Sequence, residues 1–298
     1  MNNETLAIVV TYNRKELLVE NIQALMKQTR ACDILIVDNN SVDGTEKSIK
    51  GFVDGDSVVY LNTGKNIGGA GGFSVGMRYA LTKGYKYAWL MDDDTIPDSN
   101  ALESLESKAY NLKDNFSFLS SRVTWTDGSL CLMNVQYLPE TVNDNFCHLR
   151  EGIVPVKLAS FVSFFANCNV AKSVGLPIKE FFIYGDDWEY SLRMNSQKPS
   201  YLDYDSIVIH KMKQNCGVNV VTCDRSRIDR CYYNIRNTYY IEKKYFSKNH
   251  LRKYWLHQFK TLVEIKRSST DSKIKRCSVV LKGMRDGRRF KPNIEYVE

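Results

Sequence analysis

Three consecutive aspartates are the residues of this sequence with the clearest capacity for chemistry. Asp92, Asp93 and Asp94 directly follow the apolar run "AWLM". Adjacent carboxylates repel one another, so the triplet is either a solvated turn with a helix cap or a site that binds a cation. Mg²⁺ and Mn²⁺ prefer hard oxygen ligands and usually bind one or two carboxylates together with substrate phosphates. The triplet alone leaves both interpretations open.

A second acidic pair, Asp186 and Asp187, lies in the stretch "FFIYGDDWEYSLRM" at the start of a predicted helix that also contains Glu189. Acidic residues in the first turn of a helix can simply stabilise it. A carboxylate beside another carboxylate and under aromatic rings can instead have a raised pKa, as a general base requires. His210 ends a later predicted strand, where a neutral imidazole is either structural or a further metal ligand.

A glycine-rich stretch, "NIGGAGGF" at residues 66–73, opens another predicted helix. Glycines let a backbone approach a ligand closely, and the amino end of a helix favours anions. The stretch has neither the Gly-Lys-Ser/Thr of a Walker A loop nor a GxGxxG fingerprint. It therefore indicates either contact with a phosphate or sugar, or only a tight loop.

Strands alternate with helices in the first third of the chain. Apolar, β-branched runs predict buried strands at residues 6–13, 32–41, 57–63 and 85–94. This alternation predicts an α/β fold with a mostly parallel sheet flanked by helices. It also places the polar residues at the carboxyl ends of the strands, where open α/β sheets bind ligands. The pattern then weakens, although we still expect a strand at 116–125 and a strand–turn–helix at 158–175.

Charge is distributed unevenly along the 298-residue chain, whose net charge is +7. Residues 243–291 contain 16 Lys or Arg and 3 Asp or Glu, a net charge of +13, so the rest of the chain carries −6. Aromatic and leucine residues are interleaved with these basic residues, as in helices that lie at a membrane surface; a solvated helical cap is the alternative. A nucleic-acid-binding module would leave the acidic clusters unexplained, because carboxylates repel phosphodiesters.

The amino terminus has no charged segment followed by a signal-like apolar stretch, and no apolar run reaches 18 residues. We therefore expect neither a secretory signal nor a transmembrane helix. The eight cysteines form no CxxC pair and no regular framework. We expect reduced thiols in a cytoplasmic protein, peripheral at the inner face of the cytoplasmic membrane if the basic segment meets lipid.

The order of the motifs is more specific than any one of them. The chain reads TYNR, VDNNSxDGT, NIGGAGG, WLMDDD, FFIYGDDWEYSLR and VIH. Over roughly residues 5–215 it resembles the family 2 inverting glycosyltransferases of the GT-A fold. Within that family it looks most like the bacterial galactofuranosyltransferases and the polysaccharide rhamnosyltransferases, as do the segments 232–240 and 281–291. Beyond residue 230 the chain becomes basic, aromatic and helical in period, so we expect a GT-A catalytic domain over 1–235 and a basic helical C-terminal region over 236–298.

The resemblance also implies a binding site for a nucleotide sugar linked to UDP or dTDP. Asp38 would accept the N–H of the base, and the glycine loop would border the diphosphate. The donor-binding residues implied in this way are Thr11, Tyr12, Asn13, Arg14, Asp38, Asn39, Asn66, Gly68, Gly69, Asp92 and Asp93.

The remaining roles implied by the resemblance concern the cofactor and the reaction. Asp94 and His210, with Asp92, would hold Mn²⁺ or Mg²⁺ on the diphosphate. Asp187 would take the proton of the acceptor hydroxyl as it attacks the anomeric carbon. Asp186 and Glu189 would position that hydroxyl or a sugar hydroxyl. A single displacement inverts the anomeric centre, so no enzyme nucleophile is needed.

The expected reaction moves galactofuranose from UDP-galactofuranose to a glycan or a lipid-linked glycan in bacterial cell-surface polysaccharide synthesis. Transfer of rhamnose from dTDP-rhamnose is the alternative. A sugar nucleotidyltransferase is more distant, because that class favours a basic glycine loop near the first strand, whereas the loop here comes later. The sequence leaves the donor sugar, the acceptor and the oligomeric state open.

Overall fold

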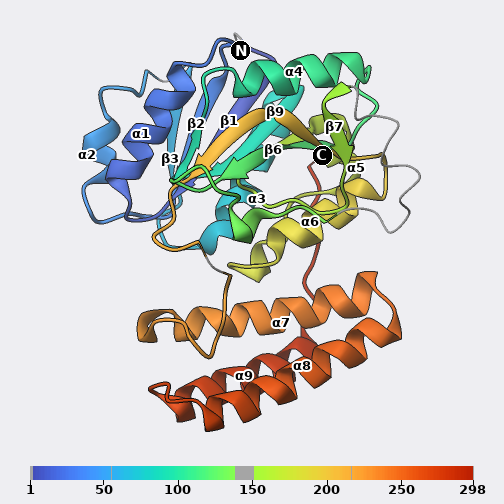
Figure 1. Cartoon of the computed structure of the whole chain (residues 1–298). Coiled ribbons are helices and arrows are strands. Elements are labelled where there is room, and N and C mark those ends of the chain that lie inside the picture. The colour runs from blue at the N-terminus through green and yellow to red at the C-terminus, as the bar shows by residue number, and fades with distance from the viewer. Residues whose placement is uncertain (1–2, 55, 138–150, 216, 298) are drawn as a thin grey trace.

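The computed structural model describes residues 3–54, 56–137, 151–215 and 217–297. It contains one twisted sheet with helices on both faces and a separate layer of three helices below it (Figure 1). The sheet has nine strands, in the order β3-β2-β1-β4-β8-β6-β9-β5, and β7 pairs with β9. This architecture confirms the predicted α/β class and the helical C-terminal extension.

The first half of the sheet is parallel, as predicted. Its strands are β1 (Thr5–Thr11), β2 (Asp33–Asp38), β3 (Val58–Asn62) and β4 (Tyr87–Asp92). The helices that connect them are α1 (Lys15–Met26), α2 (Thr45–Ile49) and α3 (Gly68–Lys83). Every residue of β1 and β2 is buried, because helices cover both faces of a parallel sheet.

The second half of the sheet is mixed, which the sequence did not indicate. Strand β8 runs antiparallel between β4 and β6, whereas β6 and β9 are parallel. The strands are β5 (Thr95–Pro97), β6 (Phe118–Thr124), β7 (Ile153–Pro155), β8 (Phe164–Asn167) and β9 (Tyr201–His210). The helices are α4 (Ala101–Asn111), α5 (Cys168–Val174) and α6 (Asp186–Asn195), with 3₁₀ turns η1 (Leu132–Asn134) and η4 (Lys179–Phe181).

Two glycines of α3 are required for packing against the sheet. A Cβ added at Gly76 would lie 2.3 Å from Cγ2 of Ile8, and one at Gly72 would lie 2.6 Å from Cγ1 of Val10. Such distances are far below van der Waals contact, so only glycine lets α3 lie this close to β1. Part of the glycine-rich pattern therefore serves the packing of α3 on the sheet, and contact of Gly68 and Gly69 with a ligand stays a prediction.

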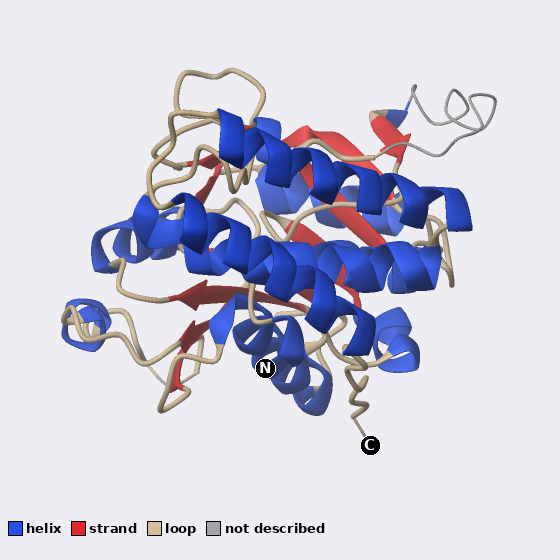
Figure 2. Ribbon diagram, turned by 90° about the horizontal axis from the view of Figure 1, so that it is seen from below, coloured by secondary structure: helices blue, strands red, loops and turns tan. Residues whose placement is uncertain are grey.

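Three long helices follow the sheet: α7 (Ile228–Tyr245), α8 (Lys248–Arg267) and α9 (Lys273–Arg289). Seen from below, they lie across the sheet-bearing layer (Figure 2). They share a small core that includes Ile235, Tyr254 and Val280, while Ile241 of α7 joins a cluster with Ala70 on α3. Residue 235, the predicted domain boundary, lies inside α7, so the division into two domains stays a prediction.

Among the described residues, none of the helices combines the length and hydropathy that crossing a bilayer requires. The cysteines that the structure describes are all free thiols: Cys32, Cys131, Cys168, Cys223, Cys231 and Cys277. Cys147 and Cys216 lie outside the described residues.

Candidate active site

The register of the sheet brings polar residues from distant parts of the sequence to one edge. Thr11 at the end of β1 pairs with Asp38 at the end of β2. Val10, one residue earlier, pairs with Asp92 at the end of β4. Strand β9 ends at His210, which pairs with Thr95 just after the aspartate triplet. The carboxyl ends of four strands therefore supply the predicted site residues.

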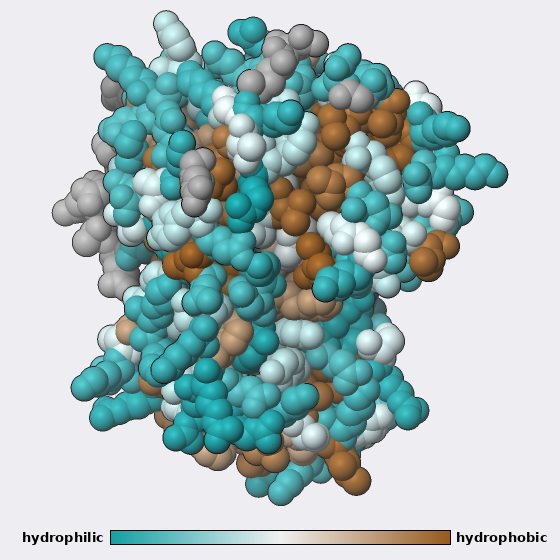
Figure 3. Space-filling view, turned by 180° about the vertical axis from the view of Figure 1, so that it is seen from behind, coloured by the Kyte–Doolittle hydropathy of each residue, from teal (hydrophilic) through white to brown (hydrophobic). Residues whose placement is uncertain are grey.

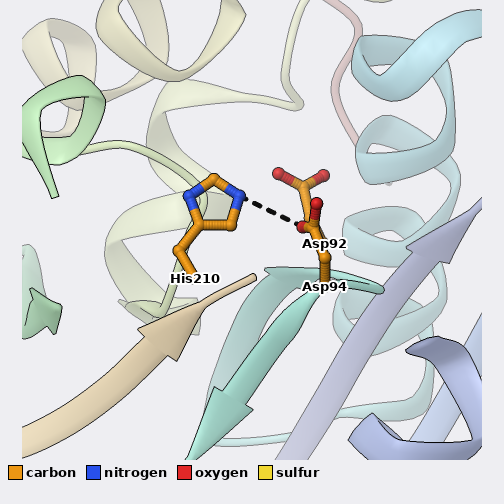
Figure 4. Close-up of side chains that lie close together, drawn as sticks. All are labelled: Asp92, Asp94 and His210. Atoms are coloured by element: carbon orange, nitrogen blue, oxygen red, sulfur yellow. Dashed lines mark hydrogen bonds and ion pairs between the residues drawn. The ribbon is translucent and has the colours of Figure 1, made fainter. Parts of the chain in front are cut away.

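Asp92, Asp94 and His210 form the cluster expected for a divalent metal. One potential ligand atom from each residue lies within 4.8 Å of the other two. The Nε2 atom of His210 is 3.1 Å from Oδ1 of Asp94, and the carboxylate of Asp92 lies beside them (Figure 4). Two carboxylates and an imidazole suit Mn²⁺ and are compatible with Mg²⁺, so these residues fit the cation that the family resemblance implies.

Asn134 fixes the orientation of the histidine. Its Oδ1 lies 2.8 Å from Nδ1 of His210, and its Nδ2 donates to Oγ of Ser160 at 2.7 Å. Because the amide nitrogen is used by the serine, the amide oxygen accepts the proton on Nδ1, and Nε2 is directed at Asp94. Such an outer partner sets which ring nitrogen can bind a metal. Asn134 lies in a segment without a distinctive pattern, so no feature of the sequence indicated its role.

The pKa values of the cluster show how its charges interact. Burial lowers the pKa of His210, but the hydrogen bond with Asp94 and the nearby carboxylates outweigh this and raise it to about 10. Burial and the charge of Asp94 raise the pKa of Asp92 to about 6. Burial also acts to raise the pKa of Asp94, yet His210 and Arg14 hold it below its ordinary value. Positive charge at this edge is therefore needed to keep the carboxylates ionised.

Arg14 and Asp93 are engaged with the site itself. Nη1 of Arg14 lies 2.5 Å from Oδ2 of Asp94 and 3.2 Å from Oδ1 of Asp93. Thr11 donates from Oγ1 to Oδ2 of Asp93 at 2.7 Å. Burial raises the pKa of Asp93 to about 7 despite the nearby guanidinium. The predicted contact of these residues with a donor stays a prediction, and their observed contacts hold the aspartate triplet in place.

The predicted base-binding residues lie at the ends of β1 and β2. Asp38 accepts hydrogen bonds from the backbone N–H of Ser41 at 2.9 Å, from its Oγ at 2.6 Å and from Oη of Tyr60 at 2.8 Å. Asn39 donates from Nδ2 to the carbonyl of Gly68 at 3.1 Å, while its buried Oδ1 has no hydrogen-bond partner in the structure. This acceptor is a candidate contact for a ligand.

Two neighbouring loops complete this end of the site. Asn13 adopts a positive φ of 54° and links the loops after β1 and β2, because its Oδ1 accepts from the N–H of Val42 at 2.8 Å. Tyr12 beside it is 40% exposed. At the start of α3, Asn66 accepts from the N–H of Gly68 at 2.9 Å, and space around Gly69 is open.

The acidic pair lies in the first turn of α6. The N-cap residue is Gly185, and no side chain caps the helix. Asp187 accepts only a local bond at Oδ1, from the N–H of Trp188 at 2.8 Å. Burial raises the pKa of Asp187 to about 7 and that of Asp186 well above its ordinary value, and the charge of Asp92 acts on both. The charge of Asp92 therefore couples the ionisation of the pair to the Asp92–Asp94–His210 cluster.

Glu189 is fully buried and paired within the protein. Arg193 donates to its carboxylate from Nε at 3.0 Å and from Nη2 at 2.8 Å, and Tyr245 donates from Oη at 2.5 Å. Lys244 of α7 lies 3.6 Å away. The predicted contact of Glu189 with the acceptor stays a prediction. Its observed contacts join α6 to α7.

Comparisons with known proteins agree with this geometry. Residues 6–129 match the family model "Glycosyl transferase family 2". The chain is 42% identical over 107 residues to the galactofuranosyltransferase GlfT1 of Mycolicibacterium smegmatis, covering 35% of this chain and 34% of the relative. It is 28% identical over 199 residues to GlfT1 of Mycobacterium tuberculosis, covering 65% of each. These matches span less than two thirds of either relative.

A third relative matches more of the chain: the dTDP-rhamnosyl transferase RfbF of Shigella flexneri is 26% identical over 258 residues, covering 82% of this chain and 81% of the relative.

Two solved structures share the fold. Residues 1–349 of TarS from S. aureus superpose with a TM-score of 0.52 at 15% identity, covering 94% of this chain and 71% of that one. GalNAc-T7 with UDP, GalNAc and Mn²⁺ superposes with a TM-score of 0.64 at 13% identity, covering 98% and 55%. These two structures show that the chain has the GT-A fold, and the family match identifies residues 6–129 as a family 2 glycosyltransferase domain.

Proposed function

We propose that the protein transfers a sugar from a nucleotide-linked donor to a hydroxyl group of a glycan or lipid-linked glycan, with inversion at the anomeric carbon. One observation carries this proposal. The Asp92–Asp94–His210 cluster lies at the sheet edge, and the charge of Asp92 acts on the acidic pair of buried Asp186 and half-buried Asp187, whose pKa values are raised. Such an arrangement provides a cation site for the leaving group and a base for the attacking group.

Asp92, Asp94 and His210 would hold Mn²⁺ or Mg²⁺, which when bound supplies a positive charge that stabilises the leaving nucleoside diphosphate. The residues contribute two carboxylates and an Nε2 atom that Asn134 directs toward the site. The donor diphosphate would lie near Gly69, where an added Cβ would meet open space and where α3 has the positive end of its helix dipole.

The nucleoside would lie between the loops after β1 and β2. The exposed ring of Tyr12 can cover the base, and the unpaired Oδ1 of Asn39 can accept a donor N–H or hydroxyl. The carboxylate of Asp38 would accept from the base, although Ser41 and Tyr60 already donate to it. These two partners were not predicted from the sequence, and they fix the direction of that carboxylate.

Asp187 would act as the general base. Its carboxylate takes the proton of the acceptor hydroxyl while that oxygen bonds to the anomeric carbon and the bond to the diphosphate breaks. A raised pKa makes the carboxylate a better proton acceptor, provided that it is ionised at the working pH. Asp186 would orient the acceptor beside it.

Galactofuranose is the proposed sugar, because both GlfT1 relatives are named galactofuranosyltransferases. Rhamnose is the alternative, because RfbF matches a larger share of the chain. A nucleotidyltransferase would release pyrophosphate rather than a nucleoside diphosphate, so the released product separates that class.

The outer faces of α8 and α9 favour a membrane-surface partner. On α8, Leu256, Phe259 and Val263 are 61%, 57% and 47% exposed, and Lys260 and Arg267 line the same shallow hollow. A second hollow also combines apolar and basic side chains: Ile274, Leu281, Lys282 and Arg285 of α9 and Lys266 of α8. Viewed from behind, the helical layer is mostly hydrophilic, with hydrophobic groups at its lower margin (Figure 3).

We infer that this surface, named here the α8–α9 face, binds an anionic lipid surface. Apolar side chains flanked by Lys and Arg suit insertion at the headgroup level, where each well-placed basic residue contributes about 1 kcal/mol. A second copy of the chain is disfavoured as the partner, because a two-fold contact would bring like charges together. A lipid-linked acceptor would then be presented close to the enzyme.

The donor proposal predicts release of UDP from UDP-galactofuranose in the presence of Mn²⁺ or Mg²⁺ and a glycan acceptor. Release of dTDP from dTDP-rhamnose is the second expected outcome, and a coupled assay for nucleoside diphosphate measures both. Turnover of a UDP-hexopyranose alone would contradict the galactofuranose assignment. Release of pyrophosphate would contradict glycosyl transfer itself.

The metal proposal predicts that EDTA abolishes transfer and that added Mn²⁺ or Mg²⁺ restores it. Asp94→Ala should reduce the transfer rate at least about 100-fold, because a group that stabilises the developing charge of the transition state typically contributes this much. The same variant should lose Mn²⁺ binding, measured by electron paramagnetic resonance. Asp98→Ala, at an exposed residue a few positions along, is the matched control and should keep both. Full activity in EDTA would refute the proposal.

The base proposal predicts that Asp187→Asn binds nucleotide and metal but transfers about 10²- to 10⁴-fold more slowly. Asp186→Asn should be milder or should raise KM for the acceptor. Wild-type turnover should fall on acidification, with a midpoint above the ordinary carboxyl pKa of about 4, because the protonated base is inactive. A dead Asp186→Asn with an active Asp187→Asn would reverse the two assignments.

The substitution Asp187→Asn also has a predictable effect on the stability of the protein. Because burial raises the pKa of Asp187 in the folded state, this group destabilises the fold as pH rises through the raised pKa. Asp187→Asn removes that effect, so its melting temperature at pH 8 should equal or exceed that of the wild type. If Asp187 only capped the helix, Asp187→Asn would instead lower the stability of the protein by about 1 kcal/mol and leave turnover nearly intact.

The lipid proposal predicts that the full chain sediments with vesicles that contain phosphatidylglycerol and that added salt weakens the binding. Leu256→Ser with Phe259→Ser should weaken it further, because the apolar contact is lost. Tyr110→Ser, at a residue 82% exposed on α4, is the control and should bind as the wild type does. Binding that is indifferent to salt and to the paired change would refute the proposal.

A further inference from the structure

The turn that precedes the acidic pair has an uncommon backbone. Phe182 has φ 64° and ψ −56°, and the N–H of Ile183 donates to the carbonyl of Phe181 at 2.7 Å, which together form the rarer kind of γ-turn. Tyr184 and Gly185 follow with φ of 67° and 81°. Residues other than glycine rarely adopt such φ values, so surrounding contacts must hold this 181–185 turn in place.

Asn237 of α7 provides those contacts. Its side chain is fully buried, and its Nδ2 faces three carbonyl oxygens of the turn. Its Oδ1 accepts from Nε of Arg236 at 2.9 Å, which fixes the direction of the amide. The carbonyl oxygens lie at 3.0 Å (Phe181), 3.1 Å (Ile183) and 2.7 Å (Tyr184).

Neighbours of Asn237 reinforce the contact. Arg236 donates from Nη2 to the carbonyls of Glu180 at 2.6 Å and of Phe181 at 3.3 Å. Its guanidinium lies 3.9 Å from the ring centroid of Phe290, next to α9. The ring of Tyr233 stacks on that of Phe182, with centroids 4.8 Å apart. Side chains of α7 therefore contact both the backbone carbonyls of the turn and the side chain of Phe182.

The turn also joins the two halves of the proposed site. The carbonyl of Phe182 accepts from the N–H of Ala70 at 3.2 Å, and a Cβ added at Gly68 would lie 2.1 Å from that oxygen. At its other end, Gly185 is the N-cap of α6, directly before the acidic pair. A displacement of the turn would move the acidic pair relative to the glycine loop.

We infer that Asn237 is a positioning residue for the transfer reaction: it holds the 181–185 turn and thereby sets the place of Asp186 and Asp187 against the donor. The inference rests on the proposed function for its kinetic consequence, and on the structure alone for its conformational one. Small misplacements of reacting groups slow a reaction strongly while leaving ligand binding largely intact.

The test compares Asn237→Asp with Asn234→Asp, which makes the same chemical change one turn earlier on α7. A carboxylate at 237 cannot donate and would face the three carbonyl oxygens. We expect kcat to fall at least about 10-fold with less than about 3-fold change in the Kd for UDP and Mn²⁺. Hydrogen exchange of the 181–187 amides should accelerate relative to β1 amides, and the control should match the wild type in all three measurements.

Other outcomes decide against the inference. A lower melting temperature with unchanged kcat and unchanged relative exchange at 181–187 would show that Asn237 only stabilises the fold. If Asn237→Asp does not fold, Arg236→Lys is tested instead, because lysine keeps the charge but not the planar fork of the guanidinium. This variant must then show the same changes in kcat and in hydrogen exchange, in milder form. A wild-type result for Arg236→Lys overturns the inference. If no donor is turned over by the wild type, the proposed function fails, and the exchange data still decide the role of Asn237.

Discussion

Burial of several carboxylates at one edge of the sheet is the constraint on which the rest of this structure depends. Asp93, Asp94 and Asp186 are each less than a tenth exposed, and Asp92 and Asp187 lie among them. Buried like charges raise one another's pKa and oppose folding unless positive charge is nearby. The protein supplies part of that charge with Arg14 and His210, and the proposed cation would supply the rest.

The acidic pair on α6 lacks such compensation, because neither carboxylate forms an ion pair with a basic side chain among the described residues. The raised pKa values mean that ionisation of the pair destabilises the fold. The protein retains the pair by fixing the backbone that carries it. Hydrogen bonds from Asn237 to the 181–185 turn and from Tyr245 to Glu189 hold the start of α6 against α7, and the bond from the N–H of Ala70 to the carbonyl of Phe182 links the turn to α3. Rigid support of this kind is what a preorganised site requires.

Prediction from sequence succeeded where a local pattern determines the structure. The buried strands β1, β2 and β4 each correspond to an apolar run in the sequence. The polar residues at their carboxyl ends lie at one edge of the sheet, because parallel strands run in the same direction. The family resemblance implies that His210 joins the aspartates, and the structure brings its Nε2 within hydrogen-bonding distance of Asp94. The antiparallel insertion of β8 depends on long-range pairing, which no local period encodes. Asn134 and Asn237 were missed for the same reason, since their partners lie 76 and 53–56 positions away in the chain.

The predicted boundary at residue 235 illustrates a further limit of composition. Net charge changes sign along the chain near that point, but charge is mainly a property of the surface, whereas domains are separated by their cores. The described structure places Ile241 of the basic region in one cluster with Ala70 and Phe181 of the sheet-bearing region. Asn237 and Arg236 add hydrogen bonds across the same contact. Helix α7 consequently has two sides with different uses: one packs on the α8–α9 hairpin, and the other holds the turn before the acidic pair. A basic segment that looks like an appendage in the sequence therefore packs, through these contacts, against the turn that leads into the acidic pair of the candidate active site.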